Sequence, residues 1–438
     1  MGITNIVFAL LFLAAVVLFT IKIREIIFNI QLGQSLNRTD NKNERLKTML
    51  RVAFGQQKMM ARPIVGVLHF FVYVGFIVIN IEVLEIITDG LFGTHRVFAF
   101  LGGFYNFLIA SFEILAVLVL IGVIVFMIRR AILRIPRFHY REMTKWPRTD
   151  AMIILMIEVL LMSAFLLMNA SDSVLQDRNV EHYIQAGSFP ISSFLKPIFT
   201  SMSSDGIIMF ERGTWWFHII GIFAFMNYLP YSKHFHILLS FPNVFYSNLK
   251  PKGEFSNLES VTNEVKLMFD PAAATAPVVD AATVGRFGAK EVTDLTWKQL
   301  MDAYSCTECG RCTAACPANQ TRKLLSPRKI MMDTRDRLEE MGNNIDKHGK
   351  DYDDGKSLLG NYILPEEIWA CTTCNACVQE CPVNIDPLSI IVDLRRFIVM
   401  EQSAAPAEIN MMLTNIENNG APWQFPTADR LNWAKEIN

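Results

Sequence analysis

CTECGRCTAACP, at residues 306–317, has a second copy in CTTCNACVQECP, at residues 371–382. Both copies read C-x2-C-x2-C-x3-C-P, which is the spacing that holds a pair of [4Fe–4S] clusters. Three closely spaced cysteines wrap one cluster from a tight turn, and the fourth cysteine points away to the other cluster. We therefore assign the first cluster to Cys306, Cys309, Cys312 and Cys381, and the second cluster to Cys371, Cys374, Cys377 and Cys316.

Two alternatives to the clusters are a pair of zinc sites and a disulfide framework. Zinc motifs usually pair two C-x2-C knuckles rather than four cysteines followed by proline. Disulfides need an oxidising compartment, whereas the orientation derived below places this region inside the cell. All 8 cysteines of the chain lie in the two motifs, so none is left for another role.

Composition divides the 438 residues into a membrane half and a water-soluble half. The mean hydropathy of +0.27 is high for a soluble protein, and the apolar residues are concentrated before position 242. A formal net charge of -1 gives no case for nucleic-acid binding. The sequence predicts a membrane domain at 1–245, a linker at 246–290, a cluster domain at 291–400 and a tail at 401–438.

Five apolar runs are long enough to cross about 30 Å of hydrocarbon at about 1.5 Å per residue. They lie at 3–21, 64–87, 98–128, 151–169 and 214–241. The first run lacks a basic flank and a cleavage site, so we interpret it as a retained helix rather than a signal peptide. The predicted fold class is all-α: a five-helix transmembrane bundle followed by a helical cluster domain.

Basic residues in the loops predict the orientation of these helices. Segments 22–62 and 129–148 are rich in lysine and arginine, whereas the loops 88–97 and 170–213 are poor in them. The positive-inside rule places the two basic segments in the cytoplasm. We therefore expect a multi-pass protein of the inner (cytoplasmic) membrane, with its N-terminus outside and its cysteines in the cytoplasm.

Two histidines at matched depth predict a haem b. His69 lies near the start of the second run and His236 near the end of the fifth, so both are expected at the cytoplasmic side. His218 lies eighteen residues before His236, which on a continuous helix puts both on one face. The alternative is that these are interfacial or hydrogen-bonded histidines, but ionisable groups within a membrane are costly and usually functional.

Four acids lie in or near the apolar runs. We expect Glu82 and Glu85 to reach the outer headgroups. Glu113 and Glu158 lie deeper, and they are candidates for a proton relay or for the environment of a haem propionate.

The membrane half resembles a known family. Five helices, an outside N-terminus and a histidine pair spaced eighteen apart resemble the cytochrome b (γ) subunit of respiratory nitrate reductase. The cytochrome b subunit of membrane heterodisulfide reductase is similar. That family often binds a second haem through a histidine ten residues further along its second helix, where this chain has Ile79. For a second, outer haem, this chain offers His218 with His95 as its partner.

The cluster domain resembles the α-helical ferredoxin domain of succinate dehydrogenase and heterodisulfide reductase iron–sulfur subunits. Helices are predicted from Thr293 to Tyr304, from Ser326 onward, at Pro365–Trp369 and from Pro387 onward. Proline in the first turn supports three of these starts. The segment 271–284, rich in alanine, proline and valine, is predicted to be a linker without a core of its own.

The tail carries a further resemblance. NIENNGAPW at 415–423, followed by Arg430 and Trp433, is similar to the segment that precedes a cysteine-rich CCG module in heterodisulfide-reductase-like iron–sulfur oxidoreductases. The resemblance implies that a separate cytoplasmic subunit, a CCG-type iron–sulfur protein or a flavoprotein, docks on this tail.

The expected function is electron transfer at a membrane. We expect electrons to pass between a (mena)quinone pool, haem b, the two clusters and the cytoplasmic partner. The resemblance favours a subunit of an electron-transfer-flavoprotein:menaquinone oxidoreductase. The chain has no dinucleotide-binding fingerprint and no spare cysteine nucleophile, so we name no catalytic residue. The alternatives are a haem-free, membrane-anchored ferredoxin and a redox-sensing membrane protein.

Overall fold

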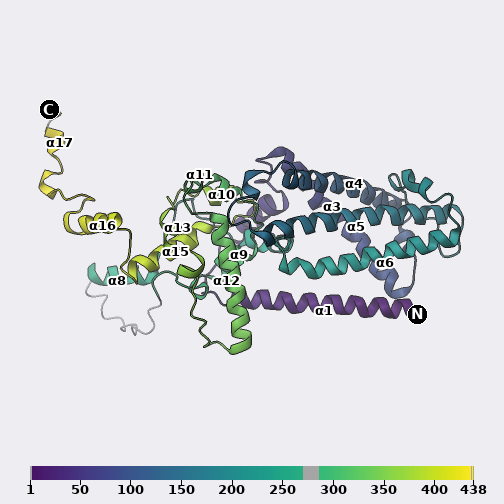
Figure 1. Cartoon of the computed structure of the whole chain (residues 1–438), viewed down its shortest axis with the longest axis horizontal. Helices are drawn as coiled ribbons and strands as arrows, with labels where there is room; N and C mark the ends of the chain where they lie inside the picture. The colour runs from purple at the N-terminus through teal and green to yellow at the C-terminus, as the bar shows by residue number, and fades with distance from the viewer. Residues whose placement is uncertain (1, 270–285, 436, 438) are drawn as a thin grey trace.

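The computed structural model describes residues 2–269, 286–435 and 437, and every regular element within them is helical. Figure 1 shows a long bundle with the N-terminus at one end and a group of shorter helices at the other end. The predicted all-α fold class is therefore confirmed for the described residues. The long bundle consists of α1 (Ile3–Gln31), α3 (Pro63–Phe92), α4 (Gly103–Ala131), α5 (Lys145–Asp177) and α6 (Ser204–Tyr228).

Shorter helices connect the bundle to the C-terminal half and build that half. The connecting helices are α2 (Lys42–Met49), α7 (His236–Phe245) and α8 (Glu259–Phe269). The cysteine domain, residues 291–400, contains α9 (Trp297–Tyr304), α10 (Arg311–Ala315), α11 (Pro317–Gln320), α12 (Pro327–His348), α13 (Pro365–Trp369), α14 (Ala376–Glu380) and α15 (Pro387–Met400). The tail contains α16 (Ala407–Asn419) and α17 (Asn432–Lys435).

Four helices, α1, α3, α4 and α5, are long and apolar enough to cross a membrane. They cover most of the first four predicted runs, and their length and composition mark the chain as a membrane protein. The predicted count of five is not confirmed, because α6 is not among these helices. Its first three turns carry Asp205, Glu211 and Arg212, which lower its hydropathy.

The predicted continuous helix at 214–241 is wrong. α6 ends at Tyr228, and the 3-10 turns η5 (Leu229–Tyr231) and η6 (Lys233–Phe235) separate it from α7. Pro230 has no N–H to continue the helix. Asp150 of α5 then fixes the turn by accepting a hydrogen bond from Ser232 Oγ at 2.7 Å. The two histidines expected on one helical face therefore lie on different helices.

Glycines let neighbouring bundle helices approach closely. A Cβ at Gly75 of α3 would lie 2.5 Å from Val119 Cγ2 of α4. A Cβ at Gly221 of α6 would lie 2.7 Å from Leu161 Cδ2 of α5. Small residues at such contacts allow the backbone-to-backbone packing on which helix association in lipid depends.

A buried polar network closes the N-terminal end of the bundle. Arg96 donates to Asp172 Oδ2 at 2.6 Å and to Tyr105 OH at 3.1 Å, and Tyr105 donates to Glu85 Oε2 at 2.7 Å. Glu82 and Glu85 are 4% and 3% exposed, so the expectation that they reach the headgroups is wrong. Glu85 has hydrogen-bond partners in this network, whereas the buried Glu82 Oε2 has no hydrogen-bond partner among the described residues.

Glu113 holds the loop that covers this network. Its Oε2 accepts hydrogen bonds from the N–H groups of Ile191 at 2.8 Å and Ser192 at 3.0 Å. Its Oε1 accepts from Asn169 Nδ2 at 3.2 Å. The carboxylate therefore satisfies the first N–H groups of the 3-10 turn η4 (Ser192–Ile198).

In the cysteine domain, helices begin where their caps predict. Thr296 accepts a hydrogen bond from Gln299 N at the start of α9, and Ser326 accepts from Lys329 N at the start of α12. Asp386 caps α15 in the same way. Such caps satisfy N–H groups that have no partner within the helix. The predicted helices at these three positions and at Pro365–Trp369 are confirmed.

The C-terminal end of α1 joins the bundle to the cysteine domain. Asn29 donates from Nδ2 to Tyr304 OH at 2.9 Å, and Gly342 of α12 packs directly on Asn29. The predicted linker segment 271–284 lies outside the described residues. The tail extends away from the body in Figure 1 and exposes apolar side chains, among them Met411 and Ile416 on α16, Trp433 on α17 and Trp423 between these helices.

Candidate metal centres

The two cysteine motifs have the same backbone conformation. Glu308 and Thr373, two residues after the first cysteine of each motif, have φ of 51° and 54°. Gly310 and Asn375 follow with φ of 69° and 59°. Both pairs lie in the left-handed region, which turns the chain sharply around each loop. Each loop then enters a single helical turn, α10 or α14, that carries the next cysteines.

Thiols of the two motifs interact electrostatically: Cys381 interacts with Cys306 and Cys309, and Cys316 interacts with Cys371, Cys374 and Cys377. In the predicted ligand assignment, the first thiol group is Cys306, Cys309, Cys312 and Cys381, and the second thiol group is Cys316, Cys371, Cys374 and Cys377. Burial, followed by the neighbouring thiols, raises the pKa of Cys312 well above its usual value. Iron would favour the deprotonated thiolates that burial alone disfavours. The ligand assignment itself stays a prediction.

Backbone N–H groups point at the cysteine sulfurs. Thr373 N lies 3.4 Å from Cys371 Sγ, and Ile385 N lies 3.3 Å from Cys381 Sγ. Donors of this kind stabilise sulfur-borne charge and tune cluster potentials. All eight cysteines are free thiols. Among the described residues, no group of His, Cys, Asp or Glu is arranged to hold a single metal ion. Eight free thiols with amide donors form a donor set that fits two [4Fe–4S] clusters.

The two thiol groups differ in their exposure. Cys306 and Cys381 of the first group are buried, whereas Cys374 of the second group is exposed. The second group therefore has one exposed cysteine, whereas every cysteine of the first group is buried or half-buried.

The basic segment that precedes α3 packs on the cysteine motifs. Lys58 Nζ donates to the Cys381 carbonyl at 3.1 Å, and Arg311 of α10 donates to the Lys58 carbonyl at 3.1 Å. Arg62 lies 3.5 Å from the Glu380 carboxylate. This segment and the cysteines thus lie on the same side of the bundle.

The two histidines predicted to hold the inner haem lie near each other. His69 lies close enough to His236 for the charges of the two rings to interact. The ring of His234 lies 5.4 Å from that of His236. His69 Nδ1 lies 2.9 Å from Gln56 Oε1, and His236 Nδ1 lies 3.0 Å from the Lys233 carbonyl oxygen. Each ring is thus held at Nδ1, which leaves Nε2 for a metal. Histidines that bind metals are usually held in this way.

The two histidines predicted for the outer haem have partners far apart on α5. His218 Nδ1 lies 3.1 Å from the Leu161 carbonyl oxygen, and His95 Nε2 lies 3.2 Å from Asp172 Oδ1. Leu161 and Asp172 are eleven residues apart, which is about 16 Å along a helix. The structure therefore does not bring His95 and His218 together. Glu158 lies near the histidines predicted for the inner haem, because its Oε1 is 3.9 Å from His234 Nε2.

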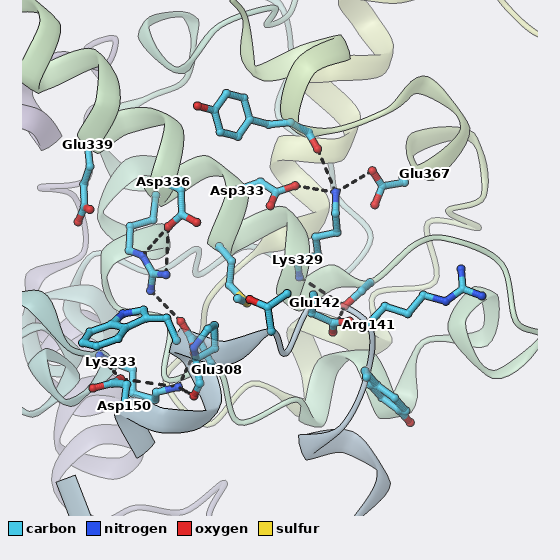
Figure 2. A pocket seen from close by; sticks show the side chains of 18 of the residues that line it. Arg141, Glu142, Asp150, Lys233, Glu308, Lys329, Asp333, Asp336, Glu339 and Glu367 are labelled. Carbon is cyan, nitrogen blue, oxygen red and sulfur yellow. Dashed lines mark hydrogen bonds and ion pairs between the residues drawn. The ribbon is translucent and has the colours of Figure 1, made fainter. Parts of the chain in front are cut away.

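A pocket of about 910 Å³ lies between the bundle and the cysteine domain, and charged side chains line it (Figure 2). Lys233 of η6 lies there between Asp150 of α5 and Glu308 of the first motif. The sequence analysis did not identify these three residues. One sequence signal could have pointed to this site. The first motif has an acid, Glu308, at the position where the second motif has Thr373.

Comparison with known proteins identifies the class to which these motifs belong. The model of the 4Fe-4S dicluster domain matches residues 302–385, which include all eight cysteines. The chain is a homologue of iron–sulfur oxidoreductases, and the iron–sulfur electron-transfer role expected from the sequence is supported. No solved structure matches the chain.

Two relatives match over nearly the whole chain. The "Probable iron-sulfur-binding oxidoreductase FadF" of Bacillus subtilis is 28% identical over 98% of this chain and 61% of its own length. The "EtfAB:quinone oxidoreductase" of Syntrophomonas wolfei is 28% identical over 92% of this chain and 55% of its own length. The chain therefore spans less than two thirds of the length of these relatives. A "Probable membrane-anchored ferredoxin" of Chromohalobacter salexigens is 32% identical over 34% of this chain and 24% of its own length.

Proposed function

We propose that this chain carries electrons between a quinone, a haem b held by His69 and His236, two [4Fe–4S] clusters and a cytoplasmic partner. The observation that carries the proposal is a short segment that contacts both predicted sites. Gln56 lies against His69 at 2.9 Å, and Lys58 donates to the Cys381 carbonyl at 3.1 Å. Because only one residue separates Gln56 from Lys58 along the chain, a haem and the first cluster would be neighbours.

The order of the carriers follows from burial. The segment that contacts His69 also contacts Cys381 of the first thiol group, and the second group contains the exposed Cys374. Haem and clusters, when bound, supply one-electron redox chemistry. The chain's own residues hold the rings, the thiolates and their neighbouring charges in fixed positions. Electrons would therefore enter or leave the protein at Cys374 and pass the first cluster on the way to the membrane.

The relative from Syntrophomonas, named as an EtfAB:quinone oxidoreductase, supports a quinone as the membrane reactant. We extend this to the specific proposal that the chain serves an electron-transfer-flavoprotein:menaquinone oxidoreductase. The basic segments 22–62 and 129–148 would face the cytoplasm together with the cysteines, and the N-terminus would lie outside. This orientation gives a cytoplasmic flavoprotein or CCG-type subunit direct access to Cys374.

The tail is the proposed docking segment for that partner. α16 exposes Met411 and Ile416, and the segment after it exposes Trp423, Phe425 and Trp433. Aromatic and methionine side chains are enriched in protein interfaces. The proposal covers residues 401–438.

A second candidate function is a haem-free, membrane-anchored ferredoxin. The match to the Chromohalobacter relative of that name favours it. In that case the histidines would have structural roles, and the helices would only tether the clusters.

One spectroscopic experiment separates the two candidates. The detergent-purified chain and its His69→Ala, His236→Ala and His348→Ala variants are compared by reduced-minus-oxidised spectra and pyridine haemochrome assay. We expect a b-type α-band in the wild type that is lost in both inner variants and kept in His348→Ala, since His348 lies at the end of α12. Cluster absorption without any haem band in the wild type would favour the anchored ferredoxin.

A further inference from the structure

The two cysteine motifs share a backbone conformation but differ in one buried charge. Glu308 lies between Cys306 and Cys309 and is 4% exposed, whereas the matching position in the second motif is Thr373. Burial raises the pKa of the Cys306 thiol, and among charged groups the Glu308 carboxylate raises it most. A carboxylate so close to a predicted cluster ligand disfavours any further negative charge on it.

Lys233 balances this carboxylate from the membrane side. Its Nζ lies 2.5 Å from Glu308 Oε2, and it also donates to the Pro147 carbonyl at 2.5 Å. Asp150 Oδ2 is 3.7 Å away. The side chains of Lys233 and Glu308 are 7% and 3% exposed, so water screens their charges only weakly. Figure 2 shows Lys233 between the two carboxylates.

Lys233 also contacts His236 through its backbone. Its carbonyl oxygen lies 3.0 Å from His236 Nδ1. One residue of the η6 turn therefore contacts the predicted haem ligand through its backbone and the first cysteine loop through its side chain. On the other side of Glu308, Arg335 Nη1 donates to Oε1 at 3.0 Å.

We propose that the buried Glu308–Lys233 pair sets the reduction potential of the first cluster, and that Lys233 is the positioning residue that couples this cluster to the His236 segment. The inference rests on the part of the proposed function that places [4Fe–4S] clusters on the two thiol groups. Reduction adds one electron to a cluster, so a nearby negative charge lowers its potential and a nearby positive charge raises it. The second motif has no such pair at Thr373, and the two clusters should therefore differ in potential.

Two single variants should shift the potential of the first cluster in opposite directions. In Glu308→Gln the repulsion of the added electron is lost, and the potential rises. In Lys233→Met the carboxylate keeps only Arg335 as a side-chain partner, and the potential falls. We expect each shift to change the ratio of reduced to oxidised cluster up to about tenfold at a fixed potential, which is about 59 mV for a one-electron couple.

A purely structural role for the pair predicts a different outcome. Either single variant leaves one buried charge without its main partner, and both would disturb the loop in the same way. The double variant Glu308→Gln/Lys233→Met removes both charges and is expected to return the potential close to that of the wild type. It also keeps the test open if one single variant folds poorly, because buried pairs are often replaced together without loss of stability.

The measurement is a redox titration of the full detergent-solubilised chain, followed by electron paramagnetic resonance of each cluster. Cys374→Ser, which alters a predicted ligand of the second cluster, assigns the two signals. Thr373→Val is the matched control and should leave the first cluster unchanged. Shifts in the same direction for both single variants, or no shift with both clusters present, would overturn the inference. A wild type that lacks cluster signals would instead refute the proposed function.

Discussion

At the scale of single residues, one lysine in the pocket between the bundle and the cysteine domain contacts two carboxylates. Lys329 Nζ lies 2.7 Å from Asp333, 2.9 Å from Glu367 and 2.9 Å from the Tyr362 carbonyl (Figure 2). One ammonium thus serves two carboxylates. Burial, with Glu367 nearby, raises the pKa of Asp333 to about 6 despite the bond to Lys329.

This pKa predicts a dependence of stability on pH. Because the folded state holds the proton on Asp333 more tightly than the unfolded state, the protein loses stability as pH rises from about 4 through about 6. The side chain in Asp333→Asn does not titrate, so this variant does not lose stability through this group as pH rises. Its free energy of unfolding should rise relative to the wild type by about 1 kcal/mol between pH 5 and pH 7. Chemical denaturation of the solubilised chain at the two pH values measures the difference, and a difference that does not change with pH would contradict it.

Sequence reasoning at this scale located cysteines and histidines but not the charges around them. The cysteine spacing is local, so it predicts a ligand assignment for each thiol group, and this assignment stays a prediction. Glu308 and Lys233 are 75 residues apart in the chain. Their contact depends on how the bundle meets the cysteine domain, and no local pattern encodes that. Glu85 was misjudged for a related reason, because its partners Phe98 and Tyr105 come from the next loop and the next helix.

At the scale of elements, glycine contacts determine how closely the bundle helices pack. Val119 is β-branched and its side chain has little freedom to move. We expect Gly75→Ala to force α3 and α4 apart and to lower stability by about 1–3 kcal/mol. Gly213→Ala is the matched control, because a Cβ at Gly213 in α6 meets nothing within 4 Å. That change should be neutral or stabilising, since alanine favours helix. An equal loss of stability in Gly75→Ala and Gly213→Ala, measured by denaturation, would contradict the packing argument.

Helix starts in the cysteine domain could be predicted, because a proline in the first turn is part of the helix that it marks. The break between α6 and α7 was not predicted. Pro230 is a local signal for it, but the polar contacts of Asp150 with Tyr228 and Ser232 separate the two helices, and Asp150 lies on α5. The spacing of eighteen residues between His218 and His236 was therefore applied to a helix that does not continue.

At the scale of the whole molecule, the division into an apolar half and a cysteine-containing half could be predicted from composition. The docking of the halves could not, because it depends on single contacts such as Asn29 on Gly342 and Lys58 on Cys381. The second contact brings the segment that holds His69 onto Cys381. The result is one continuous arrangement from α3 to the exposed Cys374, which is the basis of the proposed electron path.

The most direct test of that path is stopped-flow electron transfer between a menaquinol analogue and the clusters in the purified chain. The account predicts that the analogue exchanges electrons with the clusters in the wild type. In His69→Ala the exchange should fall at least tenfold, although both clusters are still present by electron paramagnetic resonance. His348→Ala should behave as the wild type. Unchanged exchange in a haem-free His69→Ala variant would contradict a path through the membrane haem.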